Sequence, residues 1–396
     1  MAHRSLIAGA LALFLVFAVV GTVAGAPAAG DAWAWGLNAD GELGNGTVTP
    51  YSGLSTPVQA ANLSSVVSVA GGDQHSLALR SDGTVWAWGN DGWGQLGNGK
   101  YTRSLVPIQV PGLTNVTAIA AGSLHNLAVK SDGTVWAWGF NYFGQVGTLP
   151  SGGRGNVLSP NMVKGLTGVT AVAAGGDTSF ALKSDRTVWA WGYDGQGQLG
   201  NGTSDEKSHG TPTRVKNLST AVAIGAGVEH GLAVLADGSV SAWGDNQTSE
   251  LGATTTAKCG VYRSPCSTVP VRVSGLSAVT AVAGGYGYSL ALRSDGSGWG
   301  WGADGYGELG NGAAQLYGGV KTPVRAKVSS VVAIAAGASF SLWLRSDGTV
   351  WATGYNGDGQ LGDGTFNDSV TPVQAQVSRV FSIAAGHSHS LALRSA

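Results

Sequence analysis

Charged side chains are scarce in this sequence. Asp, Glu, Lys and Arg make up 11% of its 396 residues, against about 25% in ordinary soluble domains. The two signs almost cancel, to a net charge of −1, so the chain has no excess of positive charge that would attract nucleic acid or anionic lipid. We therefore expect no nucleic-acid partner.

Cysteine is nearly absent. The chain has two, Cys259 and Cys266, and both lie in the segment "KCGVYRSPC". Two cysteines this close together can form a disulfide in an oxidising compartment, and we predict that they do. Binding of a metal ion by the two thiols is the alternative.

Catalytic and cofactor-binding motifs are missing too. The sequence has no nucleophile elbow, P-loop, dinucleotide fingerprint or HExxH motif. Glycine pairs such as Gly92 and Gly94 are turn residues in a chain with 65 glycines. We expect no cofactor and no metal ion, and a protein that binds rather than one that catalyses.

A long apolar run occurs only near the start of the chain. It extends from Leu6 to Val20, after Arg4 and before the small residues around Ala28. This order is that of a secretory signal peptide, which we place at residues 1–30. The alternative is an uncleaved anchor, because the run approaches the roughly 18 residues that span a bilayer. We predict a secreted or extracytoplasmic protein, with the membrane as a partner only if the leader stays uncleaved.

A repeat dominates the rest of the chain. The dipeptide "WG", or "TG" in the last copy, recurs about every fifty residues, with its glycine at Gly36, Gly89, Gly139, Gly192, Gly244, Gly302 and Gly354. Repeats of this length indicate a propeller or a solenoid.

Each repeat predicts four strands: a small-residue strand such as "VVSVA", then "HSLALR", then "TVWAWG", and an outer strand with proline such as "SLVPIQV". Asp-Gly between the second and third strands is a hairpin signal. The copy at Asp185 and Arg186 breaks this signal and predicts a different turn.

The two ends of the repeat region complement each other. The chain ends in "HSLALRSA", where a third strand is due, and "GDAWAWG" near residue 31 supplies that strand. Pairing them in one blade closes a ring and covers strand edges that a solenoid would leave open. We predict an all-β, seven-bladed β-propeller of four-stranded blades in a single domain, residues 31–396, and a monomer.

The recurring string "AGxxHSLALRSDGxVWAWGxNxxGQLG" resembles the regulator of chromosome condensation repeat family, whose members form seven-bladed propellers. That family includes a nuclear guanine-nucleotide exchange factor, a plant ultraviolet receptor and a secreted bacterial inhibitor of β-lactamase. The resemblance implies a propeller without deciding its function. An exchange-factor or regulatory scaffold role, and an enzyme of the lyase or hydrolase class with its site at the channel mouth, are the alternatives to a binding role.

Most tryptophans belong to the repeat. Twelve of the fourteen occupy the third-strand motif, where Trp86 and Trp88 share one face of the strand. We expect these tryptophans to pack between blades. The exceptions are Trp343, in a second strand, and Trp93, in a loop.

Histidine often begins the second strand, as in His75, His125, His230 and His389. We expect it to form a structural hydrogen bond with a neighbouring backbone group. The weaker alternative is a mixed site of histidine and carboxylate at the channel mouth, made of His387, His389, Asp73, Asp177 and Glu229.

The loop that follows the third strand carries the candidate binding site. By strand direction, these loops and the turns between first and second strands emerge on the same side of the ring, here called the upper side. The position of Trp93 differs from copy to copy, so the fold does not dictate it, and loop aromatics are enriched at protein interfaces. The candidate binding residues are Trp93, Phe140, Tyr142, Phe143, Tyr193, Tyr306 and Tyr355. They predict a secreted, non-enzymatic protein that binds a macromolecular partner, with inhibition of an extracellular enzyme as one form of that role.

Overall fold

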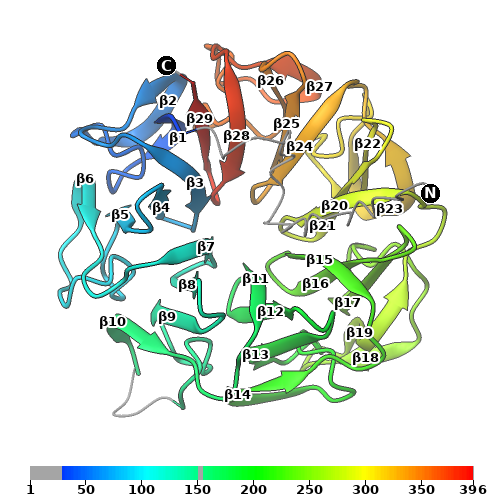
Figure 1. Cartoon of the computed structure of the whole chain (residues 1–396). Coiled ribbons are helices and arrows are strands. Elements are labelled where there is room, and N and C mark those ends of the chain that lie inside the picture. Colours follow the sequence, from blue (N-terminus) through cyan, green and yellow to red (C-terminus); the bar gives the residue numbers. More distant parts are fainter. Residues whose placement is uncertain (1–28, 150–154, 396) are drawn as a thin grey trace, which may run out of the picture.

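The computed structural model describes residues 29–149 and 155–395, which form 29 β-strands in seven sheets around a central axis (Figure 1). The innermost strands are β3 (Val66–Gly71), β7 (Val116–Ala121), β11 (Val169–Ala174), β15 (Ala221–Ala226), β20 (Val279–Gly284), β24 (Val331–Ala336) and β28 (Val380–Ala385). The second strands are β4 (His75–Arg80), β8 (His125–Lys130), β12 (Thr178–Lys183), β16 (His230–Leu235), β21 (Tyr288–Arg293), β25 (Phe340–Arg345) and β29 (His389–Arg394).

The third strands are β5 (Val85–Gly89), β9 (Val135–Gly139), β13 (Val188–Asp194), β17 (Val240–Asp245), β22 (Gly298–Asp304), β26 (Val350–Gly354) and β1 (Asp31–Asn38). The outer strands are β6 (Ser104–Gln109), β10 (Val157–Met162), β14 (Asp205–Arg214), β19 (Ser264–Arg272), β23 (Gln315–Arg325), β27 (Ser369–Gln374) and β2 (Thr49–Gln59). We number the blades 1 to 7 in ring order, beginning with the sheet of β3 and ending with the sheet of β28. The predicted seven-bladed propeller is confirmed.

Blade 4 departs from the four-stranded pattern. A short strand, β18 (Ala257–Cys259), pairs with the outer strand β19 and makes a five-stranded sheet. The predicted disulfide, Cys259–Cys266, joins these two strands. The sequence predicted the disulfide but not this additional strand.

Both ends of the repeat region meet in blade 7, as predicted. Strand β1 pairs antiparallel with β29, from Asp31 opposite Arg394 to Gly36 opposite His389. Gly30, at the end of the predicted leader, forms a backbone bridge to Val66 of blade 1. Residues 1–28 of that leader lie outside the described residues.

The hairpins between second and third strands share one turn. In blade 1, Gly83 has a φ of +78° and its N–H donates to the carbonyl of Arg80 at 2.9 Å. The expectation of a different turn at Asp185 and Arg186 is wrong. Arg186 adopts a φ of +65° and donates to Lys183 at 2.9 Å, because the flanking strands impose the turn even on a residue with a side chain.

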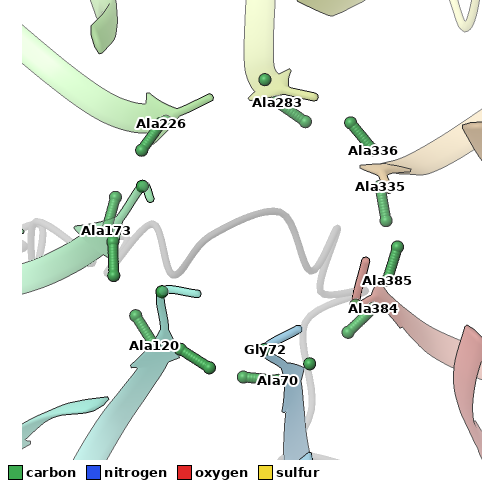
Figure 2. A pocket seen from close by; sticks show the side chains of 18 of the residues that line it. Ala70, Gly72, Ala120, Ala173, Ala226, Ala283, Ala335, Ala336, Ala384 and Ala385 are labelled. Carbon is green, nitrogen blue, oxygen red and sulfur yellow. The ribbon is translucent and has the colours of Figure 1, made fainter. Parts of the chain in front are cut away.

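The inner ends of the blades are tied together by a closed circle of backbone hydrogen bonds on the upper side. Each of the seven junctions has one, with N–H to carbonyl distances of 3.0 to 3.2 Å: Asp73 to Ser123, Ser123 to Gly175, Gly176 to Val228, Val228 to Gly285, Tyr286 to Ala338, Ala338 to His387, and His387 to Gly72. This circle surrounds a channel of about 220 Å³. Alanines such as Ala120 and Ala173 line it (Figure 2), as expected for the crowded axis of a ring.

The two tryptophans of the third-strand motif have different surroundings. The second is fully buried between blades, and its indole N–H donates to the carbonyl of a Gln or Glu in the preceding blade's loop, as Trp138 does to Gln95 at 2.9 Å. The first, such as Trp136, is half-buried, with the ammonium of Lys130 5.0 Å from its ring centroid. The second tryptophan therefore fills the junction between blades as expected, whereas the first packs against the buried cluster as a half-buried residue.

Candidate functional site

The upper side of the ring brings together the loops and turns that the sequence placed there. The N–H of Phe140, just after β9, donates to the carbonyl of Leu124 in the preceding turn at 2.9 Å. The same bond recurs in the neighbouring blades, as between Asn90 and Gln74. Loops and turns thus form one continuous rim around the channel mouth.

Five of the seven candidate aromatic residues form a chain of ring contacts along this rim. The centroids lie 5.1 Å apart for Trp93 and Phe140, 6.3 Å for Phe140 and Tyr142, 4.9 Å for Tyr142 and Phe143, and 4.6 Å for Phe143 and Tyr193. We call these five residues the aromatic arc. It crosses from blade 1 to blade 3, and Tyr142 is 52% exposed while the others are half-buried.

The other two candidates lie elsewhere. Tyr306 and Tyr355 contact each other at 5.1 Å between blades 5 and 6. Tyr306 is 45% exposed. The structure therefore divides the predicted set into the arc and a separate pair.

Motif residues hold the loop of the arc in place. The N–H of Phe143 donates to Oε1 of Gln145 at 3.0 Å, and the N–H of Val146 donates to Oδ1 of Asn141 at 3.1 Å. The same two braces, with Glu for Gln or Asp for Asn in some copies, occur in all seven repeats. The backbone thus keeps one shape whatever side chain stands at the position of Phe143.

The next blade also clamps this loop. From β14, the N–H of His209 donates to the carbonyl of Phe143 at 2.9 Å, and the hydroxyl of Ser208 donates to the carbonyl of Tyr142 at 3.0 Å. The arc is therefore supported from two blades, which presents its rings on a rigid base.

Carboxylates border the end of the arc. The hydroxyl of Tyr193 donates to Oε2 of Glu206 at 2.7 Å. Asp73, Asp177 and Glu229 lie in the nearby turns, and with Glu206 we call them the acidic flank. Within the described residues, no Lys, Arg or His forms an ion pair with any of these four.

The electrostatics of the flank follow from burial and mutual repulsion. Burial, reinforced by the charge of Asp73, raises the pKa of Asp177 to about 6. Burial and the charges of Asp245, Asp177 and Glu206 also raise the pKa of Glu229. Burial and the bond to Glu206 raise the pKa of Tyr193, so this phenol stays protonated.

The histidines at the second-strand position are structural. His125 Nε2 lies 2.9 Å from Oγ of Ser179 in the next blade, and that hydroxyl itself donates to the carbonyl of Gln145 at 2.8 Å. Nε2 must therefore carry the proton and donate. Burial lowers the pKa of His125 to about 3, so the ring stays neutral. The partner is a side chain of the next blade, also for His75, His230 and His389, and not the backbone group that we expected.

The alternative site of histidine and carboxylate at the channel mouth is not assembled as the sequence suggested. His387 acts electrostatically on Asp358, beside its own turn, rather than on Asp177. Within residues 29–149 and 155–395, no three His, Cys, Asp or Glu side chains converge as a metal site would require. In the same ranges, no helix has the length and apolar character needed to cross a bilayer.

Sequence reasoning missed part of the flank. Asp177 and Glu229 were considered only as members of a mixed metal site, and Glu206 was not singled out. Glu206 lies at the start of the outer strand β14 (Asp205–Arg214), in an insertion for which the repeat offers no alignment partner. The pair of acidic residues in "SDEKS" was the only signal that could have pointed to it.

The fold and the rim define a repeat propeller whose third-strand loops all lie on one side. The sequence profile described as RCC1-like domain matches residues 19–317, and that of the regulator of chromosome condensation (RCC1) repeat matches residues 295–344 and 347–393. The chain belongs to the RCC1-like domain family.

Two curated proteins are similar to this chain in sequence. The chain is 30% identical over 348 residues to the E3 ubiquitin-protein ligase HERC2 of Homo sapiens, covering 85% of this chain and 7% of that protein. It is 30% identical over 238 residues to the mitochondrial RCC1 domain-containing protein RUG3 of Arabidopsis thaliana, covering 56% of this chain and 52% of that protein. The chain thus spans about half the length of RUG3 and a small part of HERC2.

Solved structures show the same fold. Human WBSCR16 superposes with a TM-score of 0.79 and 23% identity, covering 92% of this chain and all of that one. Prp20p from Saccharomyces cerevisiae superposes with a TM-score of 0.80 and 22% identity, covering 94% of this chain and 92% of that one.

Proposed function

We propose that this protein is a secreted, non-enzymatic propeller that binds a macromolecular partner through its upper rim. The observation that carries the proposal is the aromatic arc, in which five aromatic side chains from three blades meet on a rigid rim. Aromatic residues dominate the binding energy of many protein interfaces, because they bury large areas with few rotatable bonds.

Relatives of the same fold support a protein as the partner. The structure of Prp20p was described together with its binding to Gsp1p and histones. Its identity to this chain is 22%, so the comparison supports protein binding as a use of the fold and names no partner for this chain.

Secretion is part of the proposal. The apolar run after Arg4 is typical of a signal peptide. The disulfide between Cys259 and Cys266 is typical of oxidising compartments. Inhibition of an extracellular enzyme is one role that such a rim could serve. Fractionation of the native host, with mass spectrometry of the N-terminus, tests this part; a cytosolic chain that keeps residues 1–28 would contradict it.

The binding role is tested by capture from the native extracellular fraction. The variant Trp93→Ala, Tyr142→Ala, Phe143→Ala is expected to lose a partner that the unchanged protein retains, because the arc supplies the contact. The matched control is Tyr306→Ala, Tyr355→Ala, which removes the separate aromatic pair and is expected to keep the partner. Circular dichroism establishes that both variants are folded. A folded arc variant that captures the partner as well as the control does would overturn the proposal.

A further inference from the structure

The aromatic arc and the acidic flank form one continuous surface. Tyr193 belongs to both, since its ring packs against Phe143 at 4.6 Å and its hydroxyl donates to Glu206 at 2.7 Å. Aromatic faces and carboxylates therefore stand side by side on the rim.

On the lower side of the same molecule, a ring and a carboxylate together hold a cation of the chain itself. In blade 1, the guanidinium of Arg80 lies over the ring of Trp86 at 5.8 Å and pairs with the carboxylate of Asp82 at 3.3 Å. Five other blades place a Lys or Arg over the equivalent tryptophan. In blade 4, Leu235 stands at the position of the cation and Ser241 at the position of the tryptophan, so this blade has neither the cation nor the ring.

On the upper rim, the rings of Phe143 and Tyr193 stand next to the acidic flank. Among the described residues, no Lys or Arg lies over the rings of Phe143 or Tyr193. Lys207 and His209, the nearest basic residues in sequence, act instead on Asp205. Among the described residues, no basic side chain forms an ion pair with the acidic flank, so its negative charges stay concentrated there.

We propose that the partner docks on this surface through a segment rich in lysine or arginine. Its cationic side chains would lie over Tyr142, Phe143 and Tyr193 and pair with Glu206, Asp177 and Glu229. The arc crosses three blades, so the matching segment is extended rather than a single residue. This inference rests on the proposed binding function and adds the chemistry of the partner to it.

The mutual repulsion of the flank agrees with this assignment. The charges of neighbouring carboxylates help to raise the pKa of Asp177 and Glu229. A bound cation relieves such repulsion, whereas a neutral ligand leaves it in place. A carbohydrate, which also stacks on aromatic rings, would therefore gain nothing from the charge of the flank.

The test uses the full-length chain and a fluorescent peptide of alternating lysine and glycine, with the same peptide carrying acetylated lysines as the neutral probe. Fluorescence anisotropy is expected to show binding of the cationic peptide only, weakening by at least about tenfold from about 50 to about 300 mM NaCl because the contacts are charged. The variant Glu206→Gln, Glu229→Gln is expected to bind at least about tenfold more weakly. The matched control, Asp82→Asn, Asp132→Asn, removes two carboxylates from the lower side and is expected to bind like the unchanged protein.

Three outcomes would overturn the inference: equal binding of the acetylated peptide, unchanged binding by Glu206→Gln, Glu229→Gln, or binding of a neutral oligosaccharide in place of the cationic peptide. The variant Tyr193→Phe removes the hydroxyl and keeps the ring. It is expected to retain most of the affinity for the cationic peptide, because the stacking surface remains. Failure of this inference can be distinguished from failure of the proposed binding function. If the native partner is captured through the arc but is not released by salt, the binding function stands and the cationic segment is wrong.

Discussion

Trp138 and Phe143 lie five residues apart in one repeat, one at the junction between two blades and the other on the upper rim. Trp138 is fully buried, and its indole N–H is bonded to Gln95 of the preceding blade. Phe143 is half-buried on the rim, and its position holds Asp, Trp, Gln, Thr or Tyr in other copies. Packing between blades dictates the first side chain. The loop braces fix only the backbone around the second, which leaves its side chain open to selection for binding.

The largest loss of stability is expected from a substitution at the junction between blades. Trp138→Ala is expected to lower the free energy of unfolding by about 3 to 5 kcal/mol, because it opens a cavity between blades and leaves the carbonyl of Gln95 with one donor fewer. Trp136→Ala should cost less, since Trp136 is half-buried, and Phe143→Ala least. Urea denaturation measures all three. Equal losses for Trp138→Ala and Phe143→Ala would remove the distinction between junction and rim.

Glu42 sharpens the comparison because it occupies the loop position that Gln95 and Gln145 hold in other repeats. Burial raises its pKa from 4.5 to about 7. The folded state therefore holds the proton more tightly than the unfolded chain, and the stability that this supplies is complete below pH 4.5 and is lost as the pH rises to about 7.

Glu42→Gln is expected to raise the free energy of unfolding by about 3 kcal/mol at pH 8 and to change it little at pH 4.5, because one pKa unit corresponds to about 1.4 kcal/mol. Unfolding at the two pH values checks this. Gln95→Glu is the reciprocal variant and should destabilise the protein at pH 8 only. A gain from Glu42→Gln that does not depend on pH would contradict the assignment.

The junction between blades 5 and 6 uses different residues for the same packing. Thr353 replaces the buried motif tryptophan, Trp343 of β25 is fully buried instead, and Gly298 of β22 leaves room for its ring. Thr353→Trp is expected to destabilise the protein by about 1 to 3 kcal/mol through overpacking. In the double variant Trp343→Ala, Thr353→Trp, the loss should be smaller than the sum of the single losses. Additive losses would show that the two positions do not share one space.

The smallest change in stability is expected on the lower side, where the hairpin turns between second and third strands share one shape. Arg186→Gly is expected to stabilise the protein by about 1 kcal/mol, because glycine adopts the φ of +65° without the steric cost that a side chain imposes. Thermal unfolding measures the gain. The matched control, Gly83→Arg, places a side chain in the equivalent turn of blade 1 and should cost a similar amount.

Much of the fold could be predicted because its signals are local and repeated. The spacing of "WG", the four strand strings and the complementary ends predicted seven blades and closure in blade 7, and the pair of cysteines predicted the disulfide. The turn at Arg186 was predicted wrongly because a dipeptide was weighed without the strands that constrain it. The bond from His125 to Ser179 joins two blades, and spacing within one repeat says nothing about such a partner.

The sequence by itself determined the architecture, since a fifty-residue repeat with period-two strands can bury its apolar faces only against copies of itself, and complementary ends close the ring. Only the tertiary structure decided which rim residues meet. Trp93 joins Phe140, Phe143 joins Tyr193 and Tyr193 joins Glu206, while Tyr306 and Tyr355 stand apart. The physical reason is that these contacts cross from blade to blade and depend on side-chain reach and on insertions such as that of Glu206, which no repeat period encodes.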